Sequence, residues 1–318
     1  MIDSPRRLVL VGSVLVDVLM RVELLPERGA DVLARGAHAE VGFGRGVLSA
    51  ARRHGMSAAF AGRYGSGPFG AQVRAALVQD GVDMLIPLPA SGDSGFRVGF
   101  VEAGGARTSA TSPGVETALD RQSLDRLAIR DDDAVYVSGY DLTYPKSGSA
   151  IAGWARALPD SAALVFDPGP LVDDIPWDVQ QRVLRRCDIL TINARATRQL
   201  AGTGRPRAAV AALREYAPRL RLAVLRQGAD GCWVKDMDGD ARGMQVAAPP
   251  IDPVDTTGRA GAHTGVLLAY LAQGMSLRDA ALRANAAAAL SATEPGAATC
   301  PDAVALERFM DRVWRDRY

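Results

Sequence analysis

The strongest constraint on the fold of this chain is a regular alternation of short apolar runs with longer helical segments. The runs are rich in valine, isoleucine and leucine, as in strands that are buried on both faces. Predicted strands occupy 134–138, 163–166, 189–192 and 222–225, and predicted helices occupy 147–157, 179–186 and 207–216. This order predicts a mainly parallel sheet with helices on both faces.

The same alternation begins near the N-terminus. The predicted elements there are a central strand at 8–16, a helix at 47–54, a strand at 58–61 and a helix at 69–79. Polar residues follow three of the predicted strands, namely Asp17, Asp167 and Asn193. Because ligands of open α/β sheets bind beyond the carboxyl ends of the strands, we expect these three side chains in one cleft.

Two segments interrupt the alternation. Residues 18–41 and 94–110 contain strand-like pieces with turns, such as 96–102 followed by Gly104 and Gly105. They predict a small separate sheet that is inserted into the main domain as a lid. No Pro/Ser-rich linker divides the chain, and the alanine-rich stretch 280–292 predicts a helix. We therefore expect one domain over residues 1–318 with an inserted lid.

Composition argues against several classes of partner. The formal net charge of +1 gives no general attraction to nucleic acid or to an anionic membrane. No apolar stretch approaches the roughly 20 residues that span a bilayer, and the apolar start of the chain is broken by Gly12 and Asp17, which favours a strand over a signal peptide. Cys187, Cys232 and Cys300 lie far apart, so we expect a reduced, cytoplasmic protein with no zinc site.

The most informative stretch begins at Asp255. Asp255, Thr256, Thr257 and Gly258 lead through small residues into an apolar helix predicted over 266–271. Small residues at the start of a helix leave backbone N–H groups free for an anion, and the helix dipole adds to the attraction. The stretch predicts a phosphate site, and a tight turn into a buried helix is the alternative.

This stretch resembles the signature of the PfkB, or ribokinase-like, family of carbohydrate kinases, which reads DTTGAGD before an apolar helix. Asp255 to Gly258 match the signature, whereas Arg259, Ala260 and Gly261 stand where the family has Ala, Gly and Asp. In the family the GAGD backbone forms the anion hole for the transferred phosphoryl group, and the aspartate takes the proton from the substrate hydroxyl. The resemblance implies anion-hole positions at Gly258, Arg259 and Ala260 and the base position at Gly261.

Other stretches resemble motifs of the same family, in the same order, along nearly the whole chain. They are Gly12-Ser13 with Asp17, the glycine-rich sugar motif at 42–46, GRxGxxxxG at 62–70, NxxE at 193–196, KxGxxG at 226–231 and the adenine-side helix and loop at 285–298. In the sugar motif Phe43 replaces a glycine and Gly46 replaces an asparagine. In NxxE the glutamate that helps to organise magnesium and phosphates is replaced by Ala196.

The resemblance implies a doubly wound α/β fold with a small β lid. It also implies transfer of phosphate from ATP, with Mg²⁺, to a hydroxyl of a sugar or nucleoside. The substrate-binding residues implied are Asp17, Gly42, Gly44 and Gly46, and the nucleotide-binding residues are Asn193, Arg226, Gly228, Gly231 and Asn285. A monovalent cation near Asp255 and a homodimer through the lid are further implications.

The departures from the family pattern fall at positions where the family has residues that take part in substrate binding or phosphoryl transfer. They are Gly46, Ala196, Arg259 and Gly261. Glycine at 261 cannot accept a proton, and loss of a general base costs about 100- to 10,000-fold in rate. Alanine at 196 removes a carboxylate that would hold magnesium. The sequence therefore predicts a sugar kinase scaffold with severely reduced or absent phosphotransfer that retains binding of a nucleotide or a sugar.

Two functional alternatives stay open, an active kinase with a rearranged site and a regulatory pseudokinase that binds ligands without turnover. A third explanation is that the altered residues were introduced into an active parent. His263 is the only nearby candidate for a replacement base, but two helical steps of about 100° each turn it away from position 261. We expect His38 and His54 on the surface or in the lid.

Overall fold

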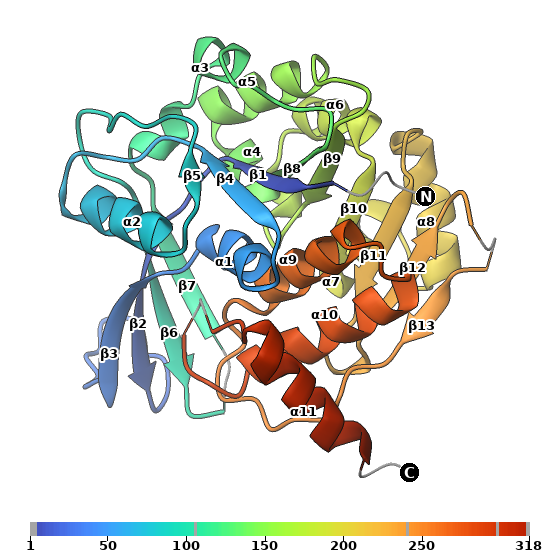
Figure 1. Ribbon diagram of the computed structural model, residues 1–318. Helices are drawn as coiled ribbons and strands as arrows, with labels where there is room; N and C mark the ends of the chain where they lie inside the picture. Colours follow the sequence, from blue (N-terminus) through green and yellow to red (C-terminus); the bar gives the residue numbers. More distant parts are fainter. Residues whose placement is uncertain (1–4, 105–106, 240–241, 297–298, 316–318) are drawn as a thin grey trace.

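The computed structural model describes residues 5–104, 107–239, 242–296 and 299–315. Its main sheet has nine strands in the order β13-β12-β11-β10-β9-β8-β1-β4-β5 (Figure 1). The strands are β1 (Arg7–Val11), β4 (Ser57–Ala61), β5 (Asp83–Met84), β8 (Asp133–Ser138), β9 (Ala163–Asp167), β10 (Ile189–Asn193), β11 (Leu222–Arg226), β12 (Cys232–Asp236) and β13 (Met244–Val246). All neighbours from β5 to β11 pair in parallel, and only β12 and β13 pair antiparallel. The prediction of a mainly parallel sheet is confirmed.

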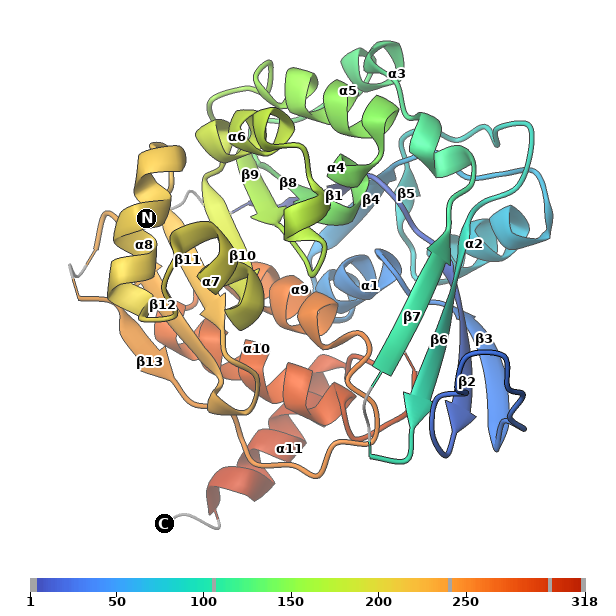
Figure 2. The ribbon, with the colours of Figure 1, turned by 180° about the vertical axis from the view of Figure 1, so that it is seen from behind.

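Helices cover both faces of this sheet because alternate strand side chains point to opposite sides. Leu8 and Leu10 of β1 pack on one side, and Val9 and Val11 pack on the other. The first side is covered by α1 (Arg45–Arg53), α2 (Pro68–Gln79), α9 (Arg259–Ala272), α10 (Leu277–Ser291) and α11 (Ala303–Arg315). The second side, seen from behind in Figure 2, carries α3 (Arg121–Asp125), α4 (Gly139–Thr143), α5 (Pro145–Ala155), α6 (Trp177–Arg186), α7 (Ala194–Ala201) and α8 (Pro206–Tyr216). The doubly wound α/β prediction is confirmed.

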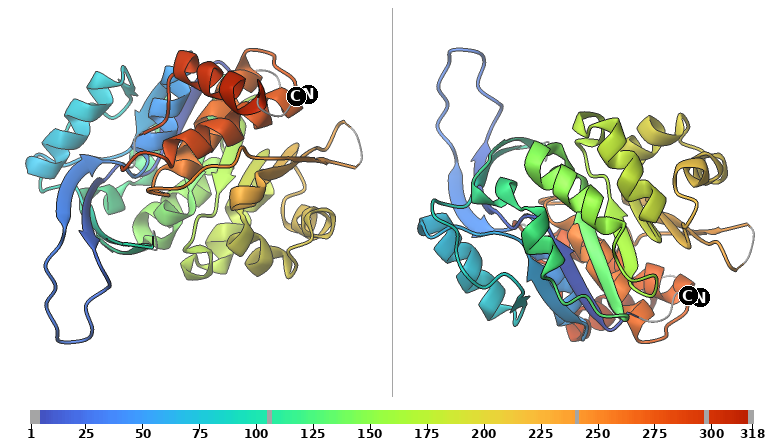
Figure 3. Two further views of the ribbon diagram at one scale, coloured as in Figure 1. Left: turned by 90° about the horizontal axis from the view of Figure 1, so that it is seen from below. Right: turned by 90° about the horizontal axis from the view of Figure 1, so that it is seen from above.

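A second sheet of four strands has the order β3-β2-β6-β7. Its strands are β2 (Val16–Val22), β3 (Gly36–Val41), β6 (Phe96–Glu102) and β7 (Arg107–Ser112), and the loop between β2 and β3 projects away from the main body (Figure 3). The segments predicted to form a lid, 18–41 and 94–110, contribute to this sheet, apart from 105–106, which lie outside the described residues. The motion of this sheet as a lid, its role in a homodimer and the division of the chain into domains stay predictions.

The prediction of one central strand over 8–16 is wrong. β1 ends at Val11, and the chain then leaves the main sheet to begin β2 at Val16. Gly12 has a φ of 144°, and a β-carbon there would lie 2.1 Å from Oδ2 of Asp141, so only glycine fits at this exit. No helix in the described part of the chain is long and apolar enough to cross a membrane.

Candidate active site

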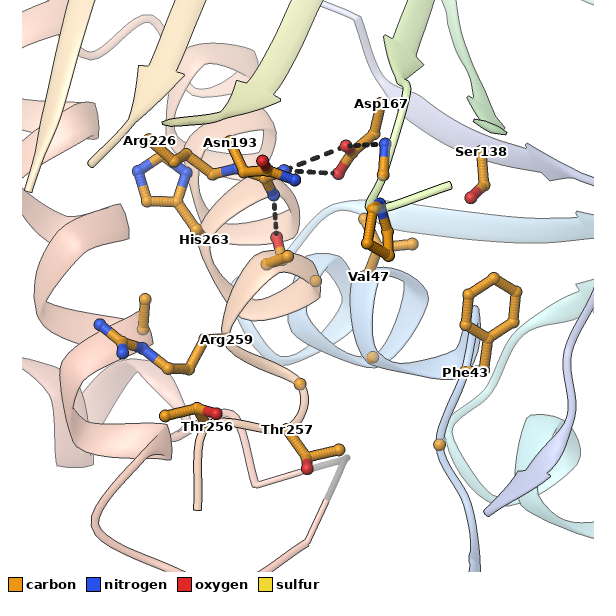
Figure 4. Close-up of a pocket in the computed structure, with 18 of the residues that line it drawn as sticks. Phe43, Val47, Ser138, Asp167, Asn193, Arg226, Thr256, Thr257, Arg259 and His263 are labelled. Atoms are coloured by element: carbon orange, nitrogen blue, oxygen red, sulfur yellow. Dashed lines mark hydrogen bonds and ion pairs between the residues drawn. The ribbon is translucent and has the colours of Figure 1, made fainter. Parts of the chain in front are cut away.

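A cleft of about 770 Å³ is lined by residues from both sheets (Figure 4). The predicted site residues among its lining are Gly42, Gly44, Gly46, Asn193, Arg226, Gly228, Gly231, Gly258, Arg259, Ala260, Gly261 and Asn285. Predicted residues that do not line it are Asp17 and Ala196. The fold thus brings the predicted substrate and nucleotide residues other than Asp17 to one cavity, and their individual roles stay predictions.

The start of α9 forms one wall of this cleft. Gly258 is the N-terminal cap in a left-handed conformation, with a φ of 80°, and no side chain caps the helix. The first backbone hydrogen bond of this helix is donated by Ala262 N–H to Gly258 O. The N–H groups of residues 259–261 therefore have no acceptor within the helix and are available to a ligand. The predicted helix over 266–271 begins seven residues earlier, at Arg259, so the small residues are its first turn. Such a helix start is suited to an anion such as phosphate.

Gly261, at the implied base position, packs against the start of α1. A β-carbon built on Gly261 would lie 2.9 Å from the backbone nitrogen of Val47 and 3.0 Å from the carbonyl carbon of Gly46. Gly265, one turn later, approaches α1 even more closely, because its β-carbon would lie 2.5 Å from Val47 O. Glycine at these two positions therefore lets α1 and α9 pack together at the floor of the cleft.

Asp17 is buried in the small sheet, and its predicted place at the tip of a central strand is wrong. It lies directly opposite Arg97 of β6, which donates from Nε at 2.6 Å and from Nη2 at 2.8 Å to the two carboxylate oxygens. Arg97 itself lines the cleft and lies 5.5 Å from the centre of the Phe43 ring. The cleft thus presents a guanidinium group where a carboxylate was expected.

Sequence reasoning missed Arg97 as a site residue. Its signal is the alternation in 96–102, where an arginine shares one strand face with Gly99 and Val101. A charged side chain on the inward face of a strand indicates a buried partner or a binding role. Arg107 of β7 was also missed. It lines the cleft, and its Nη1 donates to the hydroxyl of Thr257 at the entry to α9.

Arg226 and Asp167 form a buried ion pair at the ends of β11 and β9 (Figure 4). Nη2 of Arg226 lies 3.0 and 2.8 Å from the two oxygens of Asp167. Nη1 of Arg226 also reaches Ala260 O, at 3.4 Å, in the first turn of α9. The pair therefore fixes a positive group above the start of that helix.

Asn193 caps the helix that follows β10. Its Oδ1 accepts a bond from the backbone N–H of Ala196 at 2.9 Å. Ala196 is fully buried, and its methyl group packs in the apolar core on the α5 and α6 side of the sheet. Position 196 therefore carries a buried methyl group where the family has glutamate, and the loss of magnesium binding stays a prediction. Asp167 and Asn193 do meet at one edge, as predicted from the strand ends.

His263 lies one residue beyond Ala262 in α9 and is buried. Its Nε2 lies 3.2 Å from Oδ1 of Asn285, whose Nδ2 donates to Val246 O at 2.8 Å. Burial, helped by the charges of Arg226 and Arg259, lowers the pKa of His263 to about 3. The imidazole is therefore neutral at pH 7 and is a weak base.

The two other histidines lie outside the cleft. His38 is partly exposed on β3, as expected. The expectation for His54 is wrong, because this side chain is buried between Tyr270 Oη at 3.3 Å and Pro301 O at 3.0 Å. Pro301 is far away in the sequence, so no local pattern around residue 54 could have indicated this contact.

Asp255 shapes the loop that enters α9. Its Oδ1 accepts bonds from the N–H of Thr257 at 2.8 Å and from the Thr257 hydroxyl, and its Oδ2 accepts from Gly296 N–H at 3.1 Å. These contacts favour the turn-shaping role of Asp255. The nearby monovalent-cation site stays a prediction, and the end of the adenine-side motif, 297–298, lies outside the described residues.

Comparison with known proteins agrees with this architecture. Residues 5–303 match the model of the "pfkB family carbohydrate kinase". The chain is 31% identical over 297 residues to an uncharacterized sugar kinase of Escherichia coli, YegV, covering 90% of this chain and 88% of that one. An Arabidopsis thaliana ribokinase complexed with ribose and ATP has a TM-score of 0.77 at 20% identity, covering 96% and 99% of the two chains. An adenosine kinase of Sinorhizobium meliloti has a TM-score of 0.79 at 20% identity, with the same coverage. The chain belongs to the pfkB family of carbohydrate kinases.

Proposed function

We propose that this chain binds a nucleotide together with a small sugar or nucleoside, and that it transfers phosphate between them very slowly or not at all. The observation that carries the proposal is Gly261, which offers no proton acceptor at the implied base position and has a helix packed against it. In phosphoryl transfer a kinase contributes positioning, charge stabilisation and a group that accepts the proton of the acceptor hydroxyl. The cleft supports the first contribution, and glycine at position 261 has no side chain to supply the last.

Among the described residues, the three carboxylates nearest to the implied site are already engaged by other groups. Asp167 is engaged by Arg226, and Asp17 is engaged by Arg97. Asp255 accepts two bonds from Thr257 in the loop before α9 and one from the N–H of Gly296, which follows α10. A carboxylate whose oxygens are engaged in this way would have to give up some of these bonds to take a proton from a substrate hydroxyl. These contacts support reduced transfer over an active, rearranged site.

Binding of both ligands is supported by the shape and chemistry of the cleft. Its volume of about 770 Å³ falls within the range of small-molecule sites. The start of α9 offers backbone N–H groups, and Arg226 lies above it, so this end suits the phosphates of ATP. The other end is lined by Phe43, Tyr140 and Arg97, which together offer aromatic faces and a donor to a hydroxylated ring.

The residues of the cleft do not suit a magnesium ion held by the protein. Mg²⁺ takes oxygen ligands, usually one or two carboxylates with waters and phosphates. Asp167 is the only carboxylate among the described residues that line the cleft, and Arg226 occupies both of its oxygens. Position 196 carries a buried methyl group. Across the described ranges, no three His, Cys, Asp or Glu side chains gather as a metal site.

Heat unfolding with and without ligands tests the proposal. A ligand that binds the native chain raises the free energy of unfolding by about 2.7 kcal/mol at 100 times its Kd. We expect ATP, and one or more members of a panel of sugars and nucleosides, to raise the unfolding midpoint. ADP release in the same samples should be about 100- to 10,000-fold slower than in ordinary kinases, or stay at the level of the protein-free blank. Stabilisation accompanied by rapid turnover would support the active kinase, and no stabilisation by any ligand would contradict the binding proposal.

A further inference from the structure

We propose that the cleft binds the phosphates of a nucleoside triphosphate through arginine side chains and helix N–H groups, and that this binding does not need Mg²⁺. The inference rests on the proposed function, because it presupposes that a nucleotide enters this cleft. It concerns how the charge of the phosphates is balanced.

The first support is the position of Arg226. It covers both oxygens of the cleft carboxylate Asp167 and touches the first turn of α9 through Ala260 O. A divalent cation at this point would have to displace a guanidinium that is only one-tenth exposed, and would be repelled by it. A phosphate oxygen, in contrast, would meet a cation and free N–H groups together.

The second support is Arg259, which stands where the family has alanine. Arg259 lines the cleft, and its side chain points away from Asp167 (Figure 4). Within the described residues no salt bridge joins it to an acid, and burial alone lowers its pKa. A half-buried guanidinium without an acidic partner is unfavourable in the empty cleft, and an anionic ligand would compensate it.

Both arginines lie at the start of α9, because Arg259 is its first residue and Arg226 contacts Ala260 O in its first turn. Both Arg226 and Arg259 lower the pKa of His263, whose side chain extends from α9 to Asn285 of α10. Arg195 is a further positive side chain of the lining, and of Arg195, Arg226 and Arg259 only Arg226 pairs with a lining carboxylate within the described residues. The net charge at the phosphate end is therefore positive. Such a site favours metal-free ATP over its magnesium complex, because the bound ion cancels part of the negative charge of the ligand.

Isothermal titration of the full chain with ATP tests the inference, once with EDTA and once with excess MgCl₂. We expect a Kd in EDTA that is equal to or lower than the Kd in magnesium. Arg259→Ala should raise the Kd in EDTA about tenfold, as expected for loss of one charge-assisted bond. The matched control is Arg74→Ala, on the exposed face of α2, which should leave the Kd unchanged. Unfolding midpoints without ligand show that both variants fold.

The outcomes separate the two proposals. Binding that needs Mg²⁺, or that is at least tenfold tighter with it, overturns this inference and leaves the proposed function standing. Equal Kd values for Arg259→Ala and Arg74→Ala would overturn the part assigned to Arg259. Absence of ATP binding under both conditions would overturn the proposed function, and this inference with it.

Discussion

The backbone nitrogen of Val47 lies against Gly261, and a β-carbon on that glycine would be only 2.9 Å away from it. Contacts under 3.0 Å require the neighbour to move, and this neighbour is helix backbone rather than a flexible side chain. Position 261 therefore lacks a base and also has little room for one. An aspartate at position 261 requires α1 to shift. The single variant Gly261→Asp could therefore fail to restore activity because of this shift, even if the missing base is the cause of the low activity.

Close packing of α1 on α9 predicts an order of stability among glycine variants. Gly265→Ala should lower the free energy of unfolding by about 1–3 kcal/mol, because its β-carbon would meet Val47 O at 2.5 Å. Gly261→Ala should cost less, since its closest approach is 2.9 Å. Gly153→Ala in α5 is the matched control, with its nearest neighbour at 3.7 Å, and should stabilise by up to about 1 kcal/mol. Urea unfolding measures all three, and equal effects would contradict the packing account.

The buried ion pair of Asp17 and Arg97 predicts that substitutions of these two residues have strongly coupled effects on the free energy of unfolding. Asp17 is 0% exposed and Arg97 is 9% exposed, so Arg97→Met leaves a buried carboxylate alone. That should cost about 3–5 kcal/mol, and the double variant Asp17→Asn/Arg97→Met should cost less than the sum of the single changes.

The exposed pair Arg121–Asp125 provides the control for this cycle. Both side chains are about half exposed and lie four residues apart on α3. Arg121→Met should change the free energy of unfolding by no more than about 0.5 kcal/mol. Additive effects of Asp17→Asn and Arg97→Met would show that the buried pair is not coupled as described.

Asp141 and His263 give the stability of the chain opposite dependences on pH. Burial raises the pKa of Asp141 to about 7 and lowers the pKa of His263 to about 3. Between about pH 4 and pH 6.5, the native chain keeps a proton on Asp141 that the unfolded chain has lost, so this group lowers stability as the pH rises. In the same window the unfolded chain carries a proton on His263 that the native chain lacks, so this group raises stability as the pH rises.

Asp141→Asn should therefore expose the contribution of the histidine. As the pH falls from about 6.5 to about 4, its free energy of unfolding should drop more steeply than that of the unmodified chain, by up to about 1.4 kcal/mol per pH unit. Asparagine can still accept the bond that the Ser13 hydroxyl donates to Asp141. Urea unfolding at several pH values measures both slopes, and parallel curves would contradict the assignment.

The elements of the main sheet could be predicted from the sequence because their signals are local. The apolar runs predicted β8, β9, β10 and β11 to within one residue at each end. The prediction of one strand over 8–16 was wrong because the apolar residues of this run belong to two different sheets. The chain leaves the main sheet at Gly12, where the side chain of Asp141, distant in the sequence, leaves room for glycine only. Local patterns do not show which sheet an apolar residue joins.

In the candidate site, too, the features with local sequence signals could be predicted, and the contacts between distant residues could not. Glycines and small residues indicated the start of α9 and the loop before α1, because backbone that approaches a ligand needs them. The pairs Arg97–Asp17 and Arg226–Asp167 join residues 80 and 59 positions apart, so their formation follows from strand order. The packing of Val47 on Gly261 also depends on how two distant helices meet.

The most direct test of the central claim is ADP release by the unmodified chain, measured at high protein concentration with ATP, magnesium and a panel of sugars and nucleosides. Kinases of ordinary activity turn over about 1–100 times per second. Loss of the base predicts a rate about 100- to 10,000-fold lower, or none above the blank, in samples where ATP still stabilises the chain. Substrate-dependent release at ordinary kinase rates would contradict the account and would show that another group accepts the proton.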